Sequence, residues 1–207
     1  MMTRKLVTVT AGLSNPSSTR LLADRLTAAA EEALADRGEK AEVRVVELRD
    51  VAHDVMNAMT TRVPTGELPG ILEDVAGADG IIAVTPVFNA SYSGLFKSFF
   101  DIVEPGVLDG KPVLVAATGG SPRHSLVLEH ALRPMFSYTR SVVVPTGVYA
   151  ASEDWGAGGN GGRELSERVA RAARQLALLA TENAPAAAED PYEEPTPFAD
   201  LMSGLGA

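Results

Sequence analysis

Three short segments of this chain combine hydroxyl, amide and aromatic side chains with glycines. Loop one (residues 11–20) is rich in hydroxyls, loop two (residues 85–94) mixes aromatics with an asparagine, and loop three (residues 118–124) opens on a Thr-Gly-Gly run. Hydroxyls and backbone amides bind phosphate, aromatic side chains pack on flat rings, and glycines let a backbone approach such a ring closely. Together the three loops have the chemistry to bind a phosphorylated aromatic compound.

Loop one comes directly before a predicted helix, where backbone N–H groups and the helix dipole attract anions. It contains neither GxxxxGK[ST] nor GxGxxG, so the usual nucleotide-binding fingerprints are absent from it. The alternative is that its Ser-Ser-Thr run does no more than cap the helix. The residues that we expect to contact phosphate are Ser14, Ser17, Ser18, Thr19 and Arg20.

Loop two offers an amide and two aromatic rings. The Asn89 side chain and nearby backbone amides match the donor–acceptor edge of a pyrimidine, and Phe88 and Tyr92 can pack against a ring system. The alternative is that the aromatics belong to the core and the polar residues to a plain turn. The expected contacts of this loop are Pro86, Val87, Phe88, Asn89, Ala90, Ser91 and Tyr92.

Loop three carries the glycine pair Gly119 and Gly120, which lets a planar ligand approach without a Cβ clash. A plain turn between strand and helix would explain the pair equally well. Arg123 and His124 are the charged or titratable groups best placed to meet a nicotinamide dinucleotide. The expected ring contacts of this loop are Thr118, Gly119, Gly120 and Ser121.

Apolar strands and amphipathic helices alternate along the chain and must position these loops. Strands are predicted at residues 6–10, 42–48, 80–85, 112–117 and, in two pieces, 141–145 and 147–150. Helices are predicted at residues 19–37, 67–76, 93–103, 124–136 and 163–181. Ser17 or Ser18 should cap the first helix and Gly38 should end it. We expect the helix at 124–136 to be interrupted near Pro134, and residues 49–66 to form a loop with one helical turn.

This alternation predicts an α/β fold in three layers, a flavodoxin-like doubly wound parallel sheet of five strands in the order 2-1-3-4-5. In such a sheet the loops after parallel strands gather at the carboxyl edge. Ligands bind there, at the point where the strand order reverses. The three loops would then serve the phosphate, the pyrimidine edge and the ring face of flavin mononucleotide (FMN).

Composition limits the remaining possibilities. The chain has 207 residues, no cysteine, three scattered histidines and a net charge of −9. Thiol chemistry is excluded, a dedicated transition-metal site is not expected, and the acidic balance argues against nucleic-acid binding. No apolar run is long enough for a membrane helix, so we expect a cytoplasmic protein.

One domain with a short extension is expected: a flavodoxin-like FMN-binding domain at residues 1–182, followed by an acidic Pro/Ala-rich tail at residues 183–207. Within the tail, the short apolar motif at residues 196–202 could dock on the body or on a second subunit. A glycine-rich loop at residues 154–162 is expected to be mobile.

The loop sequences at residues 12–20, 85–97 and 117–121 resemble those of the NADPH-dependent FMN reductase family over roughly residues 4–180. The resemblance implies a flavodoxin-like fold, reduction of FMN by NADPH or NADH, and assembly as a homodimer or tetramer. It is closest to the branch partnered with luciferase-like monooxygenases, whose members end in a similar Thr-Pro-Phe tail, so a two-component monooxygenase is the implied partner. Many relatives carry an acidic or tyrosine-rich stretch before the loop-two asparagine. This chain has Val87 and Phe88 there, so backbone contacts are expected in that place.

Hydride transfer needs no acid or base at the reacting carbon, so we predict no catalytic side chain. Three other functions fit the same sequence. They are reduction of quinones, azo dyes or metal oxyanions, electron carriage of the flavodoxin type, and a protein-interaction role with a vestigial site. The helix at 93–103 is apolar enough for both core and interface use, through Leu95, Phe96, Phe99 and Phe100.

Overall fold

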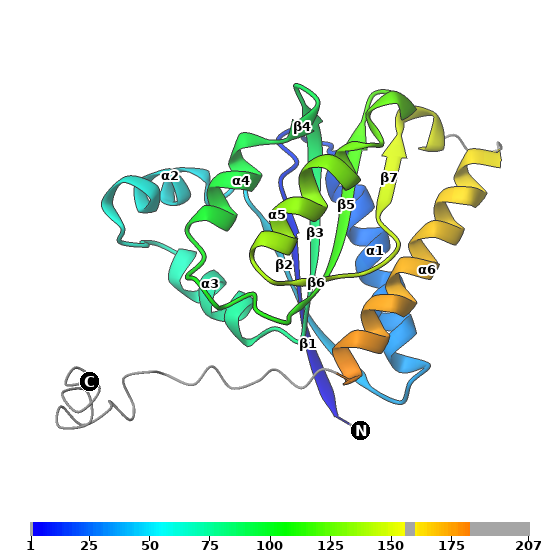
Figure 1. The fold of residues 1–207 in the computed structure, drawn as a ribbon, viewed down its shortest axis with the longest axis horizontal. Coiled ribbons are helices and arrows are strands. Elements are labelled where there is room, and N and C mark those ends of the chain that lie inside the picture. Colours follow the sequence, from blue (N-terminus) through cyan, green and yellow to red (C-terminus); the bar gives the residue numbers. More distant parts are fainter. Residues whose placement is uncertain (1, 156–159, 183–207) are drawn as a thin grey trace, which may run out of the picture.

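The computed structural model describes residues 2–155 and 160–182, in which strands and helices follow one another along the chain (Figure 1). The strands are β1 (Thr3–Thr10), β2 (Lys40–Glu47), β3 (Gly80–Phe88), β4 (Ser91–Tyr92), β5 (Pro112–Gly119), β6 (Val142–Val143) and β7 (Val148–Ala151). The α-helices are α1 (Ser18–Ala35), α2 (Ala52–Thr61), α3 (Leu68–Gly77), α4 (Gly94–Asp101), α5 (Arg133–Tyr138) and α6 (Asn160–Glu182). Short 3-10 helices η1 (Pro122–His124) and η3 (Ser152–Trp155) and a π-helix η2 (Leu128–Leu132) complete the described elements.

The sheet confirms the predicted order. Its strands run β2-β1-β3-β5-β6, all parallel, and β7 also pairs with β5 in parallel. The predicted fourth strand is therefore β5, and the predicted fifth strand is the edge pair β6 and β7. Pro145 interrupts this edge because it has no N–H to donate, and the next amide, that of Thr146, bonds to Gln175 on α6 at 2.8 Å instead.

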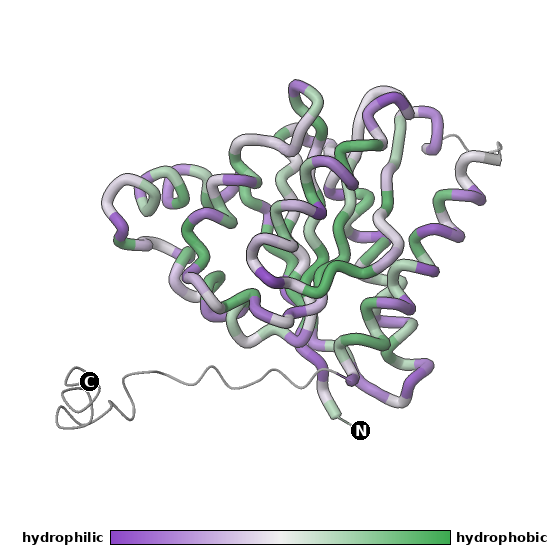
Figure 2. Tube along the Cα trace, in the orientation of Figure 1, coloured by the Kyte–Doolittle hydropathy of each residue, from purple (hydrophilic) through white to green (hydrophobic). Residues whose placement is uncertain are grey.

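Helices cover both faces of the sheet (Figure 1). Helices α2, α3, α4 and α5 pack on one face and α1 and α6 on the other. Strand β5 shows how one sequence serves both: Val113, Val115 and Ala117 enter the first core, while Leu114 and Ala116 enter the second. The apolar residues accordingly follow the strands at the centre of the molecule (Figure 2).

Local signals explain the limits of the first helix. The Ser17 side chain accepts a hydrogen bond from the Arg20 amide, so Ser17 is the predicted N-cap. Gly38 follows the helix with a φ of +76°, a conformation that side chains disfavour. On the face of the sheet opposite α1, the side chains of Phe96, Phe99 and Phe100 of α4 are buried in the core.

The prediction for residues 49–66 was wrong, because the structure has a ten-residue helix, α2, in place of a loop with one turn. No side chain caps α2, and its Met- and Thr-rich sequence gives little helical signal. Val55 and Ala58 are nevertheless buried, in the same core as α4. Tertiary packing, which local sequence does not reveal, stabilises this helix.

The predicted interruption near Pro134 is confirmed. The π-helix η2 ends at Leu132 and α5 begins at Arg133, so the regular helical pattern changes one residue before this proline. The first part of the predicted helix is also irregular, since residues 122–124 form the 3-10 helix η1. Part of the predicted mobile loop (156–159) and the whole tail (183–207) fall outside the described residues. The predictions made for them, and the division of the chain into a domain and a tail, therefore stay predictions. Across the described ranges, no helix has both the length and the apolar character needed to cross a bilayer.

Candidate functional site

The three loops converge at the carboxyl edge of the sheet, which is the upper edge in Figure 1. Strand register places their starting points side by side. Thr10 at the end of β1 is level with Val84, and Pro86 is level with Thr118. Because these strands are parallel neighbours about 4.8 Å apart, the loops that follow them must emerge next to one another.

Loops one and three are joined directly. The Thr19 and Thr118 hydroxyls, 99 positions apart in sequence, lie 2.8 Å from each other, and both residues are buried. Thr118 follows Leu114 and Ala116 on the face of β5 that meets α1, which explains how its side chain reaches the first turn of that helix. The two segments form one surface.

The backbone of loop one presents free donors at the start of an 18-residue helix. The amides of Gly12, Leu13, Ser14 and Asn15 donate to no acceptor among the described residues. The Ser14 and Ser18 side chains are exposed next to them. Unpaired loop amides directly before a helix N-terminus, whose dipole attracts anions, form an anion site, so this part of the edge suits a phosphate.

The same loop is tightly folded around a glycine. A Cβ built on Gly12 would lie 2.1 Å from the Ser17 Oγ and 3.1 Å from the Thr19 Cβ. Any side chain at position 12 would therefore displace the helix cap and the buried threonine.

Arg20, a predicted phosphate contact, has its guanidinium engaged elsewhere. Its Nε donates to Asp24 at 2.7 Å and its Nη1 to Glu47 at 2.5 Å. The hydrogen bond to Asp24, together with the charges of both carboxylates, raises the pKa of Arg20 above its ordinary value. In this arrangement Arg20 links α1 to β2, and its contact with phosphate stays a prediction.

Arg49 is a basic residue at this edge that the sequence reasoning missed. Its Nη1 donates to the Ser14 carbonyl oxygen at 3.1 Å, and its Nη2 lies 3.2 Å from Glu47. The signal that could have found it is its position: it follows β2, whose carboxyl end lies at the same edge. Arg49 braces loop one through the backbone.

Loop two is largely a β-hairpin, so the prediction that the strand ends at Thr85 and a ten-residue loop follows was wrong. Strand β3 continues to Phe88 and pairs antiparallel with β4. Asn89 and Ala90 connect them with φ values of 48° and 65°, as the two central residues of a type I′ turn require. Residues 88–90 are exposed at the tip, whereas Pro86, Val87, Ser91 and Tyr92 are half-buried. The hairpin base is held by the Ser93 amide, which donates to the Thr85 hydroxyl at 3.0 Å.

The two glycines of loop three have different reasons to be glycine. A Cβ on Gly119 would lie 2.1 Å from the Tyr149 hydroxyl, so the fold itself excludes a side chain there. A Cβ on Gly120 would meet nothing within 4 Å, and its φ is not in the left-handed region. The fold gives no reason for Gly120, which leaves an open backbone surface beside loop one. Arg123 and His124 are exposed on η1, directly after this surface.

The Thr10 hydroxyl lies buried at the carboxyl end of β1, below the three loops. Thr10 is 1% exposed, and its Oγ1 has no hydrogen-bond partner among the residues described. Two residues earlier, Thr8 shares a face with it and bonds to Thr27 of α1 at 2.7 Å. Unsatisfied buried polar atoms are rare in folded proteins, and one at the base of a cluster of free amides indicates a place where a polar ligand group or water completes the bonding.

The residues present fit FMN. The free amides and hydroxyls of loop one would hold its phosphate, and the backbone of loop three beside Gly120 would hold its ring. FMN when bound supplies hydride-accepting chemistry, for which the protein provides binding and orientation.

Comparison with known proteins identifies relatives of this chain. The model of the NADPH-dependent FMN reductase family matches residues 4–156, which include all three loops. An FMN reductase (NADPH) from Pseudomonas aeruginosa is 36% identical over 175 residues, which cover 84% of this chain and 91% of that protein. The NADH-dependent FMN reductase SfnF from Pseudomonas fluorescens is 37% identical over 175 residues, with the same coverage. Among solved structures, an oxidoreductase from Corynebacterium diphtheriae is 52% identical and superposes with a TM-score of 0.85, covering 88% of this chain and 99% of that one.

Proposed function

Because this chain belongs to the NADPH-dependent FMN reductase family, we propose that it reduces FMN with NAD(P)H and releases the reduced FMN to a separate monooxygenase. Its class is that of an oxidoreductase with FMN as the flavin.

One observation carries the FMN assignment: the Thr19–Thr118 hydrogen bond, which fixes the loop-one amides beside the loop-three glycines. The first group suits a phosphate and the second a flat ring. A ligand that bridges them needs both features, and FMN has both.

The nicotinamide donor would meet the flavin from the exposed side of the edge. Arg123 and His124 are our proposed contacts for it, since both are exposed beside loop three. The two curated relatives are named for different donors, NADPH and NADH. If Arg123 binds the additional phosphate of NADPH, Arg123→Ala should raise the KM for NADPH several-fold and leave the KM for NADH unchanged. Equal changes for both donors would remove Arg123 from this role.

Release of reduced FMN is supported by the openness of the edge. The tip of the β3–β4 hairpin is exposed, with Phe88 46% exposed, and η1 is exposed beyond loop three. A micromolar flavin complex corresponds to only about 8 kcal/mol of binding free energy, so exchange on the time scale of turnover is physically easy. We place this activity in the cytoplasm, where NAD(P)H is available. We also propose a homodimer or tetramer, which light scattering of the purified protein would test.

The proposal is tested by following electrons to a second protein. Purified protein should oxidise NADPH under anaerobic conditions only when FMN is added, and in air it should drive light emission from bacterial luciferase, which consumes reduced FMN. NADPH oxidation that proceeds only with added quinone, and gives no light, would contradict the proposal.

A further inference from the structure

Tyr149 on β7 is a buried residue that the proposed function does not yet use. It is 7% exposed, and its hydroxyl donates to the Ser121 carbonyl oxygen at 2.7 Å. The two residues are 28 positions apart in the chain. This bond ties the end of loop three to the edge strand of the sheet.

The strand register explains how Tyr149 reaches loop three. β7 pairs with β5 so that Tyr149 is level with Ala117 and Ala151 with Gly119. Tyr149 and Ala117 both face the core that contains α4 and α5, and position 119 points to the same side by alternation. The tyrosine ring therefore runs alongside β5 and places its hydroxyl in the space that a Cβ at Gly119 would need, 2.1 Å from that position.

Loop three is consequently fastened on both faces of the sheet. On the face toward α1, Thr118 bonds to Thr19, and on the opposite face Tyr149 bonds to Ser121. Between these two anchors lies Gly120, whose amide, like that of Ser121, donates to no acceptor among the described residues. The two fixed points hold two free donors in a set orientation.

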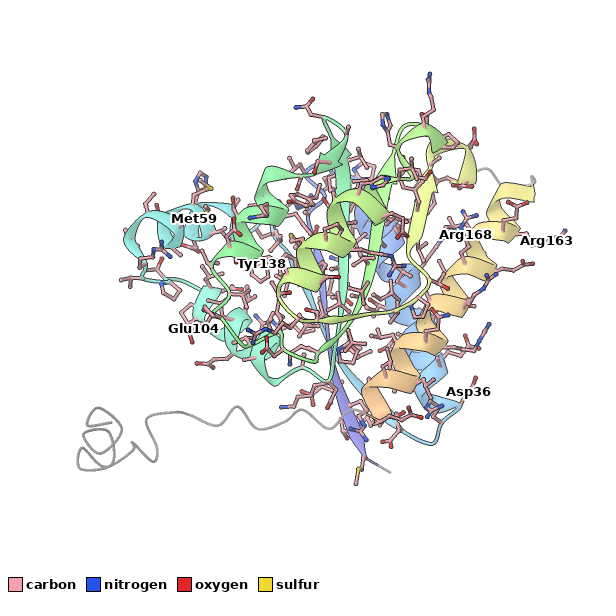
Figure 3. All side chains as sticks on the ribbon, viewed as in Figure 1. Asp36, Met59, Glu104, Tyr138, Arg163 and Arg168 are labelled. Atoms are coloured by element: carbon pink, nitrogen blue, oxygen red, sulfur yellow. The ribbon has the colours of Figure 1, made fainter. Side chains whose placement is uncertain are left out.

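The chemical state of Tyr149 suits this role. Burial, and to a smaller degree the charge of Asp154, raises the pKa of the Tyr149 hydroxyl above its ordinary value. The hydroxyl thus keeps its proton and remains a donor at neutral pH. The backbone of Tyr149 is itself held, since Arg168 (labelled in Figure 3) donates from its Nη2 to the Tyr149 carbonyl oxygen at 3.3 Å.

We propose that Tyr149 is a positioning residue for the flavin ring: it orients the Gly120 and Ser121 amides at the ring end of the site and leaves the phosphate end unaffected. This rests on the proposed FMN site. If Tyr149 has this role, the edge strand β7, which lies outside the three loops, contributes to flavin affinity.

The experiment compares two flavins that differ only in the phosphate. FMN and riboflavin are titrated into wild-type protein and into Tyr149→Phe, with the change in flavin fluorescence as the signal. Because this hydrogen bond also exists in the flavin-free protein, its loss acts on affinity only through the orientation of the Gly120 and Ser121 amides. Misorientation on the scale of one neutral hydrogen bond should weaken binding by about five-fold. The factor should be the same for FMN and riboflavin, because the lost contact is at the ring end. The visible absorption band of the bound flavin should also shift, which a change confined to protein stability would not cause.

Two control variants make the result specific. Tyr138→Phe removes a hydroxyl from a residue that is 89% exposed on the α5 side of the molecule, away from the upper edge (Figure 3), and should change neither affinity. Ser18→Ala, at the phosphate end, should weaken FMN and leave riboflavin and the absorption band unchanged.

The double variant Gly119→Ala, Tyr149→Phe tests the contact itself. Gly119→Ala alone should destabilise the fold by collision with the tyrosine hydroxyl. Removing that hydroxyl should recover part of the loss, because the next atom, Tyr149 Cζ, would lie 3.2 Å from the new methyl. Equal stability of the single and double variants would refute the packing argument.

The outcomes separate this inference from the function on which it rests. If wild-type protein binds neither flavin, the proposed function fails. If wild-type protein binds both and Tyr149→Phe binds both with wild-type affinity and spectrum, only the role of Tyr149 fails. A Tyr149→Phe defect seen with FMN alone would place the tyrosine at the phosphate end and would also overturn the proposal.

Discussion

Loops one and three differ from loop two in how they are fixed. A hydroxyl pair 2.8 Å apart joins loops one and three, and the residues that form it are buried. The hairpin that forms loop two is held at its base by the Ser93–Thr85 bond, while its tip is exposed. Loops one and three are thus held in place without a ligand, whereas the tip of the loop-two hairpin extends into solvent.

This difference matches what a flavin reductase must do. The phosphate has to be held in place, while one face of the ring has to remain accessible to the nicotinamide and the product has to leave. A preformed phosphate end supplies affinity without an ordering cost on binding. The exposed hairpin can border the ring without closing over it. Affinity should therefore depend strongly on loops one and three and weakly on the hairpin tip.

The largest effect is expected at Gly12. Gly12→Ala should lower FMN affinity by more than tenfold, because its methyl would lie 2.1 Å from the Ser17 Oγ and force the loop open. Gly70→Ala is the matched control: Gly70 lies on α3 with nothing within 4 Å of the new methyl. It should leave affinity unchanged and raise stability by up to about 1 kcal/mol. A flavin titration of both variants checks this, and unchanged affinity in Gly12→Ala would remove loop one from the site.

Breaking the link between loops one and three should come next. Thr19→Val leaves the Thr118 hydroxyl buried without its partner, which should lower the free energy of unfolding by about 1–3 kcal/mol. The double variant Thr19→Val, Thr118→Val removes both hydroxyls and should regain much of that stability, with FMN affinity still reduced. Urea unfolding and flavin titration measure the two quantities. Full recovery of affinity in the double variant would show that the hydroxyl pair serves the fold alone.

A smaller effect is expected at Gly120. Gly120→Ala should weaken FMN several-fold while thermal stability stays at the wild-type value, since the new methyl meets no protein atom within 4 Å. Gly119→Ala should show the opposite pattern, with a larger effect on thermal stability than on FMN affinity. If Gly120→Ala binds FMN as tightly as wild type, the flavin does not pass over this part of loop three.

The smallest change is expected at the hairpin tip. Ala90 has a φ of 65°, so Ala90→Gly should raise stability by about 1 kcal/mol by relieving a left-handed alanine. FMN affinity should stay within about twofold, a change of less than 0.5 kcal/mol. Ala28→Gly on the exposed face of α1 is the matched control and should lower stability by a similar amount. A large loss of affinity in Ala90→Gly would mean that the tip itself grips the ligand.

The sequence was informative where patterns are local. Apolar strands, the Ser17 cap and the order of strands and helices are all visible in short windows, and they were enough to place three loops at one edge. What the sequence did not reveal depends on contacts between distant residues. Helix α2 is stabilised by packing in the core shared with α4, and Arg49 meets Ser14 across 35 positions.

The assignment of residues within the loops shows the same limit. Ser17 is both a predicted phosphate contact and the helix cap, and its side chain is used by the Arg20 amide. Arg20 has the charge for phosphate but two acidic neighbours. The glycines of loop three look equivalent in sequence, and only the position of Tyr149 distinguishes them. Residue type identifies the chemistry of a loop, whereas tertiary partners decide which members remain free for a ligand.

Hydrogen–deuterium exchange with and without saturating FMN tests the central claim most directly. If one FMN molecule contacts both loops, the amides of loop one and loop three should become protected from exchange at the same FMN concentrations. The hairpin tip should be protected less. Protection confined to one loop, or found instead on α4 and α5, where Phe100 and Met135 line a hollow of about 800 Å³, would contradict the account.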